Sequence, residues 1–135
     1  MTRPAADKTV DKPSLSLRLK ECCVDLPDLL TVYVGEQTGG AIVAGYNPAH
    51  LDTAHLAAHT TAVWRGLRRL HSVGTRDRNA KQFMSVNEHQ RLLVQAIEGT
   101  SLYLAFLTEA NHPAATYQPT FKRVLELCHQ HFQAE

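Results

Sequence analysis

Histidine and cysteine side chains are the residues of this 135-residue chain best suited to chemistry. His55 and His59 are four positions apart, so in a helix they lie one turn apart on the same face, a spacing that zinc sites use. The segment His-Leu-Ala-Ala-His lacks the glutamate of an H-E-x-x-H motif, and no third ligand stands nearby in the sequence. The simplest interpretation is two polar surface histidines, and we predict no metal site.

A second group of candidate ligands, Cys128, His129 and His131, lies close to the C-terminal end of the sequence. Cys128 falls on an apolar helical stripe, which favours a small core residue over a ligand. If the first and last helices pack side by side, Cys22 or Cys23 can approach it, so metal or redox use stays open as the less favoured alternative. Three cysteines with an adjacent pair are a poor disulfide framework, which favours a reducing cytoplasm.

Motifs of catalysis and of cofactor binding are missing from the sequence. It has no G-x-S-x-G nucleophile elbow and no G-x-x-x-x-G-K-[ST] phosphate loop, so we do not expect it to bind GTP itself. Gly39 and Gly40 are explained by a hairpin turn as well as by an anion site. The strand tyrosines Tyr33, Tyr46 and Tyr103 lack the interleaved basic residues of an RNA-binding sheet. We predict a protein with a binding or scaffolding role, no enzymatic activity and no cofactor.

Composition indicates one folded domain without a nucleic-acid or membrane partner. The chain is 44% hydrophobic and 20% charged, and 14 basic and 13 acidic residues leave a net charge of +1. No run approaches the length of a membrane helix, and the N-terminus has no apolar core of a signal peptide. We therefore expect a cytoplasmic protein, with a disordered polar tail over residues 1–12 and a single domain over residues 13–135.

Periodicity predicts three helices and five strands. The first helix, over residues 14–26, carries a stripe that begins at Leu15, although alternation of its leucines leaves a short strand as the competing interpretation. The other expected elements are strands over 29–36 and 41–46, a helix over 51–71, strands over 81–87, 91–97 and 101–108, and a helix that begins after Pro113 or Pro119. This α-β-β-α-β-β-β-α order predicts an α+β fold, a five-stranded antiparallel sheet sandwiched by helices.

The central helix over residues 51–71 has two unlike faces. One is an apolar stripe, most simply its core face: Leu56, Val63, Leu67 and Leu70. The other face has almost no side-chain bulk and repeats every fourth residue: Ala54, Ala58, Ala62 and Gly66. This small-residue ladder can lie on the protein's own sheet or against another chain. With the leucines turned to the core, the ladder faces outward, which favours a subunit interface.

Several local sequences resemble the roadblock family, the dynein light-chain type of small α/β domain. The resemblance lies in the segment Leu-Pro-Asp-Leu-Leu-Thr-Val-Tyr-Val over 26–34, in the Gly39–Gly40 turn, in Ala44–Gly45–Tyr46, in the alanine-rich helix and in the strand over 102–107. It covers about residues 14 to 133. The sequence departs from the family in having Asp28 where glycine is common, and in the prolines ahead of the last helix.

The resemblance implies a roadblock/profilin-like fold and a non-catalytic homodimeric scaffold or regulator. Members pair through the central helix and the third strand, and several bind small Ras-like GTPases or tether motor and signalling complexes. The expected dimer interface is Ala54, Ala58, Ala62, Gly66, Phe83, Met84 and Val86. The family shares no catalytic residue. The alternative is a small-molecule sensor with a profilin-like sandwich, which needs a pocket between sheet and helix where Phe83, Tyr103 and Phe106 are expected to fill the space.

Overall fold

The computed structural model describes residues 15–74, 81–110 and 114–133. The predicted tail over 1–12 lies outside these ranges, as do Pro113 and the side chain of Leu70. A first helix is described over residues 15–23. The remaining elements are β1 (Leu29–Glu36), β2 (Ile42–Tyr46), α2 (Thr53–Gly74), β3 (Gln82–Val86), β4 (Gln90–Ala96), β5 (Leu102–Glu109) and α3 (Ala114–Gln133). The predicted α+β order is confirmed, and the competing strand at residues 15–19 is wrong.

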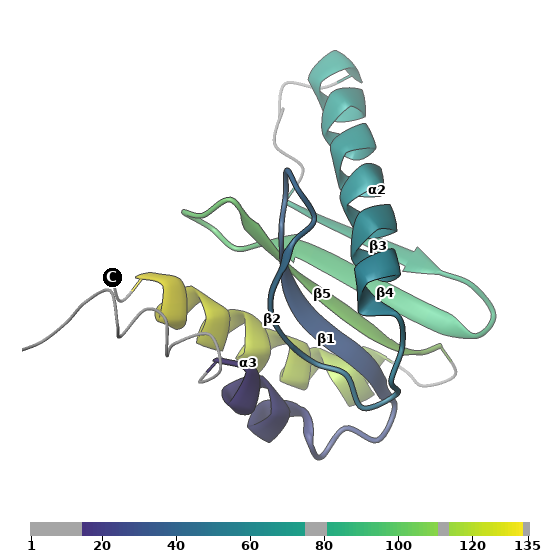
Figure 1. Cartoon of the computed structure of the whole chain (residues 1–135). Helices are drawn as coiled ribbons and strands as arrows, with labels where there is room; N and C mark the ends of the chain where they lie inside the picture. Colours follow the sequence, from purple (N-terminus) through teal and green to yellow (C-terminus); the bar gives the residue numbers. More distant parts are fainter. Residues whose placement is uncertain (1–14, 75–80, 111–113, 134–135) are drawn as a thin grey trace, which may run out of the picture.

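One antiparallel sheet of five strands forms the centre of the fold, in the order β2-β1-β5-β4-β3 (Figure 1). The hairpin β1–β2 joins the meander β3–β4–β5 through the pairing of β1 with β5, in which Val32 lies opposite Phe106. Strand β3 pairs with β4 and forms one edge of this sheet.

The first helix and α3 cover one face of the sheet, and α2 crosses the other (Figure 1). The larger core lies beneath the first helix and α3, where apolar strand residues meet the two helical stripes. Its largest fully buried members include Leu15, Leu19, Val32, Val34, Leu104, Phe106 and Val124. The predicted stripe of α3 is confirmed, with Tyr117, Phe121, Val124 and Cys128 buried.

The smaller core, under α2, is aromatic and partly polar. The indole of Trp64 stacks on the ring of Tyr103 at 6.2 Å between centroids. The Tyr103 hydroxyl lies 3.3 Å from that of Tyr33 and 3.1 Å from Thr61 Oγ1, so buried hydroxyls satisfy one another here. This arrangement requires space above β1, and Gly35 supplies it, because a Cβ there would lie 2.9 Å from the Tyr103 ring.

The core face predicted for the central helix is wrong. Val63 is 50% exposed, and Leu56 and Leu67 are only half-buried. The residues that α2 buries are instead Ala57, Thr60, Thr61 and Trp64. Thr61 is tolerated there because its hydroxyl lies 3.1 Å from that of the buried Tyr103, so the inward face of α2 is not its most hydrophobic face.

Helix ends also differ from the prediction. Helix α2 begins at Thr53, where the backbone N–H of His55 donates to Asp52 Oδ1, as an N-cap requires. It continues to Gly74, so Ser72 to Gly74 are helical and not a loop. Helix α3 begins at Ala114, which confirms the predicted start after Pro113, and the alternative start after Pro119 is wrong because Pro119 lies inside the helix. A proline this near the start of a helix removes few backbone hydrogen bonds, so the amphipathic stripe outweighs its cost.

Candidate interaction surface

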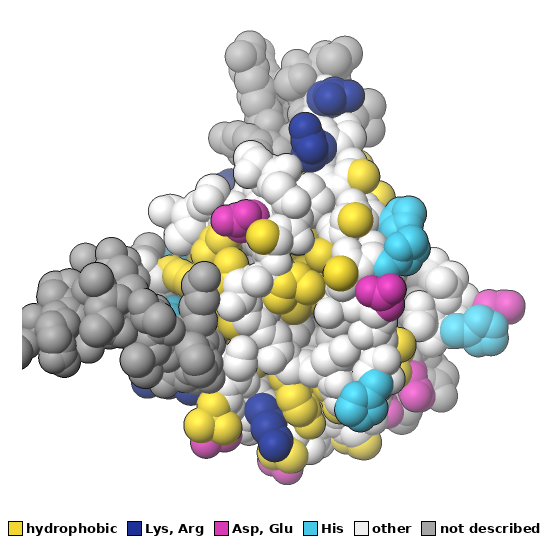
Figure 2. Space-filling view, in the orientation of Figure 1, with side chains coloured by type: hydrophobic (Ala, Val, Ile, Leu, Met, Phe, Trp, Pro, Cys, Tyr) yellow, Lys and Arg dark blue, Asp and Glu magenta, His cyan; other side chains and the backbone are white. Residues whose placement is uncertain are grey.

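The small-residue ladder of α2 faces away from the sheet. Ala54, Ala58, Ala62 and Gly66 are all exposed, and a Cβ added to Gly66 would meet no atom within 4 Å. Successive helical residues turn by roughly 100°, so Ala62 and Gly66 lie opposite the buried Ala57 and Trp64. Figure 2 shows hydrophobic side chains along this helix, with basic side chains near its far end. The predicted outward orientation of the ladder is confirmed.

The two flanks of α2 differ in their neighbours. On the flank of Ala58, the turn between β1 and β2 approaches the helix. A Cβ added to Gly40 in this turn would lie 3.2 Å from Thr61 Oγ1. On the opposite flank lie Leu56, Val63 and Leu67, of which Leu56 packs against the cluster that includes Trp64. The half-exposed Val63 extends this apolar flank beyond the protein's own core.

Strand β3 combines an open edge with apolar side chains. Met84 is 52% exposed and Val86 is 57% exposed, which is unusual for two neighbouring large hydrophobic residues of one strand. Both point to the sheet face opposite α2, since Met84 lies across from Leu93 of the larger core. Phe83 points to the α2 face and packs 5.9 Å from the ring of Trp64.

The seven residues of the predicted interface therefore do not form one continuous patch. The ladder lies on the outer surface of α2, Phe83 lies half-buried beneath that helix, and Met84 and Val86 lie on the other face of the sheet. A single flat partner cannot touch them all. A strand that pairs with the edge of β3 reaches Phe83, Met84 and Val86, because side chains of one added strand lie on both faces of the sheet. The ladder of α2 needs a second element of the partner.

The cysteines are part of the core. Burial raises the pKa of the Cys23 thiol to about 12, and burial likewise raises that of Cys128 to about 12. Both lie in the larger core, with Cys22 packed against it, so the predicted approach of the first helix to α3 is confirmed. All three cysteines are free. Neutral buried thiols are poor nucleophiles and poor metal ligands, which favours the structural role predicted for Cys128.

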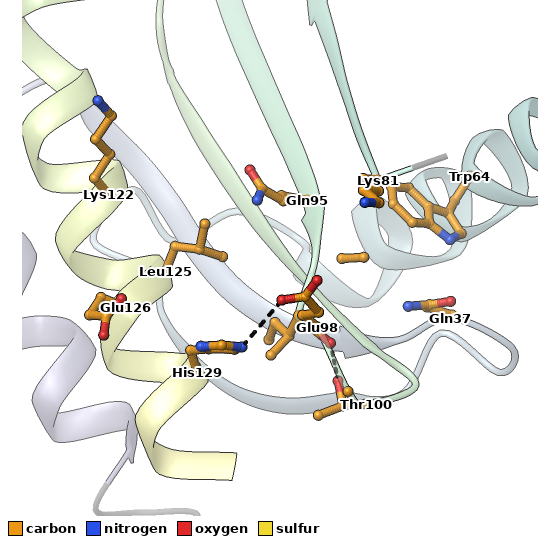
Figure 3. Close-up of a pocket in the computed structure, with 13 residues that line it drawn as sticks. Gln37, Trp64, Lys81, Gln95, Glu98, Thr100, Lys122, Leu125, Glu126 and His129 are labelled. Atoms are coloured by element: carbon orange, nitrogen blue, oxygen red, sulfur yellow. Dashed lines mark hydrogen bonds and ion pairs between the residues drawn. The ribbon is translucent and has the colours of Figure 1, made fainter. Parts of the chain in front are cut away.

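A pocket of about 640 Å³ lies at the end of the sheet, beside the turn between β4 and β5 (Figure 3). Its floor is apolar, from Trp64, Ala96, Ile97 and Leu125. Its rim carries charges of both signs, namely Lys81, Glu98, Lys122 and Glu126, together with Gln37, Gln95 and His129. His129 Nε2 lies 3.9 Å from Glu98 Oε1. Sequence reasoning missed this pocket because its residues come from α2, β4, α3 and the turns and loops between elements, and follow no local pattern.

The space between the sheet and α2 is filled by aromatic side chains, as predicted. Tyr103 is fully buried in the smaller core and Phe83 packs against it, while Phe106 fills the larger core on the other face. The pocket at the end of the sheet is thus not the one that the sensor hypothesis required. Within residues 15–74, 81–110 and 114–133, no group of three or more His, Cys, Asp or Glu side chains is placed to hold a metal ion.

Solved structures similar to this one share a single fold. MglB of Myxococcus xanthus superposes with a TM-score of 0.76 at 13% identity, over 91% of this chain and 90% of that one. The Roadblock/LC7 domain from Streptomyces avermitilis gives 0.74 at 13% identity, over 87% and 97%. The fold is of the roadblock/LC7 type. A structure named MglB with tetrameric arrangement also has this roadblock fold, with a TM-score of 0.71 at 13% identity over 97% and 92%.

Sequence comparison adds nothing to that result, since no protein-family model and no curated protein matches this sequence. The roadblock fold is thus established from structure, and at 13% identity it carries no residue roles with it. Among the helices of the described ranges, none is long and apolar enough to cross a membrane.

Proposed function

We propose that this protein is a non-catalytic homodimeric scaffold of the roadblock type, which pairs through α2 and β3. The observation that carries the proposal is the apolar edge strand β3, where Met84 and Val86 are more than half exposed beside unpaired backbone groups. Natural proteins rarely leave such an edge uncovered, because it invites pairing with other strands. A second copy that adds its own β3 covers both edges at once and forms a closed two-fold pair.

The outer surface of α2 supplies the second half of the proposed contact. Its small ladder permits close approach of another backbone, and Val63 offers an apolar flank that the protein's own core does not use. A stable interface buries about 800 Å² on each partner, which a 22-residue helix and an edge strand together can provide. One of the similar structures is named for a tetrameric arrangement of MglB, which supports assembly as a property of this fold.

The proposed binding partner of the dimer is a small Ras-like GTPase, or a signalling or motor complex that contains one. The support is the resemblance to the roadblock family together with the absence of a phosphate-binding loop from this sequence. The nucleotide in such a complex belongs to the partner, so this chain regulates or tethers and does not hydrolyse. We place this function in the cytoplasm.

Light scattering tests the dimer. We expect a mass of roughly 30 kDa, twice the 15.0 kDa of the chain. Ala58→Arg should convert the dimer to a folded monomer, because the exposed ladder leaves no cavity for a long charged side chain once a second helix lies on it. Leu17→Arg is the matched control, since Leu17 is also exposed but lies on the first helix, on the other face of the sheet. A wild-type monomer at micromolar concentration would rule the proposal out.

Binding of purified Ras-like GTPases, loaded with GDP or a non-hydrolysable GTP analogue, tests the partner. We expect wild-type protein to bind at least one of them and Ala58→Arg to bind more weakly. Equal binding by the two proteins would show that the dimer is not required. If the protein is a dimer and no GTPase binds to it, the proposed scaffold role stands and a Ras-like GTPase is excluded as its partner.

A small-molecule sensor is the second candidate function, and the 640 Å³ pocket is the observation that favours it. That volume is in the range of ligand sites, and an apolar floor with a polar rim is their usual make-up. Thermal-shift screening with nucleotides and metabolites tests it. A stabilising compound whose effect is lost in Leu125→Trp, which narrows the pocket, but kept in Leu17→Trp would support the sensor.

A further inference from the structure

Two imidazoles meet on the outward surface of α2. His59 Nε2 lies 3.1 Å from His55 Nε2, and both side chains are exposed. The ring centroids are 4.5 Å apart, farther than the two nitrogens, so the Nε2 atoms converge toward a shared point in front of the helix. In this arrangement one nitrogen donates a proton to the lone pair of the other. A metal ion bound to both nitrogens would replace this proton and lie to one side of the line that joins them, because half their separation is shorter than a metal–nitrogen bond.

The spacing of the nitrogens matches that of two ligands on one metal ion. Imidazole nitrogens bind zinc at about 2.0–2.1 Å. If one ion binds both nitrogens, which lie 3.1 Å apart, the nitrogen–metal–nitrogen angle is roughly 100°. This angle lies between the octahedral and tetrahedral values. The separation of the nitrogens therefore suits chelation of one ion, for which the rings turn so that both lone pairs face it. This geometry was not visible in the sequence, where the spacing alone was as well explained by two surface histidines.

The backbone that carries the pair is held in place. The N–H of His55 donates to Asp52 Oδ1 and that of Leu56 donates to the Asp52 carbonyl oxygen, which fixes the first turn of α2. The neighbouring Ala58 and Ala62 are small and exposed, so they leave the nitrogens open to solvent. Approach of an ion, and of further ligands to it, is unobstructed by the described residues around the pair.

We propose that His55 and His59 form a two-histidine chelate for a divalent late transition-metal ion, of the class Cu²⁺, Ni²⁺ or Zn²⁺. Imidazole is a preferred ligand for these three ions, and affinity within the class is expected to be highest for Cu²⁺. Within the described ranges no third protein ligand joins the pair, so the remaining positions are filled by water or by donor groups of another molecule. One chain supplies both histidines, so the site needs no ligand from a second copy, and in the proposed dimer the pair lies on the same outward surface of α2 as the ladder.

Isothermal titration of tag-free protein with NiCl₂, in a buffer that does not bind metals, tests the site. Wild-type protein should bind Ni²⁺ in a single process, with one ion for each chain. Removal of an outer hydrogen-bond partner of a metal ligand already weakens binding about tenfold. We therefore expect His55→Gln and His59→Gln each to lose at least roughly that factor.

His89→Gln is the matched control, because His89 is also exposed but lies in the β3–β4 turn beside Glu88. It should bind Ni²⁺ as wild type does, and circular dichroism should show all variants folded. Electron paramagnetic resonance with Cu²⁺ gives an independent readout, with two coordinated nitrogens in wild type and fewer in His59→Gln. Equal affinity of wild type and His59→Gln for Ni²⁺, or loss of binding in His89→Gln, would overturn the site.

Discussion

Gly35 and Tyr103 make a contact that leaves no room for a larger residue. The two lie opposite each other on β1 and β5, and the Tyr103 ring covers the glycine. In Gly35→Ala the new Cβ would lie 2.9 Å from Tyr103 Cζ and Oη, so the ring must shift and disturb its contacts with Thr61 and Trp64. We expect the free energy of unfolding to fall by about 1–3 kcal/mol, as for overpacked cores. Urea denaturation measures this change.

Gly66→Ala is the matched control for that prediction. A Cβ at position 66 meets no atom within 4 Å, and alanine is the better helix former, so the variant should gain about 0.5–1 kcal/mol. Equal urea midpoints for Gly35→Ala and wild type would show that the Tyr103 ring adapts without loss of stability. The close contact would then not require glycine at position 35.

Strand β3 is the element on which assembly depends most. Met84→Lys combined with Val86→Lys places two charges on its exposed positions, a device that natural edge strands use to prevent pairing. Because neither side chain contributes to the described core, we expect a folded monomer with a near-native unfolding transition. Sedimentation equilibrium measures the mass. Leu17→Lys on the first helix, combined with Val24→Lys in the turn that follows it, should leave the dimer intact, because both side chains are exposed and neither lies on α2 or β3.

Elements with strong periodicity were predictable, and the face of α2 was not. Strand β1 was predicted residue for residue, since β-branched and aromatic residues end at a glycine-rich turn. On α2 the leucine stripe predicted the wrong inward face. Hydrophobicity alone does not show that the Tyr103 hydroxyl, which also lies beside that of Tyr33, contacts the hydroxyl of Thr61. The inward face was decided by partners from distant strands, which no local pattern of the helix contains.

At the scale of the molecule, the fold was predictable and the candidate sites only in part. The order of elements and their local sequences pointed to the roadblock fold, which the solved structures then showed. Strand alternation places Phe83 on one face of the sheet and Met84 and Val86 on the other. Which face is which became clear only from the register of β3 with β4. The pocket and the convergence of His55 with His59 depend on side-chain positions that sequence spacing leaves open.

Alkaline instability is expected of the whole molecule, because its cores bury groups that must stay neutral. Burial raises the pKa of Cys23 and Cys128 to about 12, from an ordinary thiol value near 9, and burial also raises the pKa of Tyr33. The unfolded chain then releases protons at a lower pH than the native state. Stability is therefore fully present below about pH 9 and falls as the pH rises toward 12, by up to about 1.4 kcal/mol per pH unit for each thiol.

Urea denaturation between pH 7 and pH 10.5 measures the fall. Cys128→Ala, which removes one titrating thiol, should be less stable than wild type at pH 7, because a buried sulfur is lost, yet its stability should fall less steeply above pH 9. Parallel curves for Cys128→Ala and wild type would mean that the buried thiols do not limit stability, and that another group governs the alkaline transition.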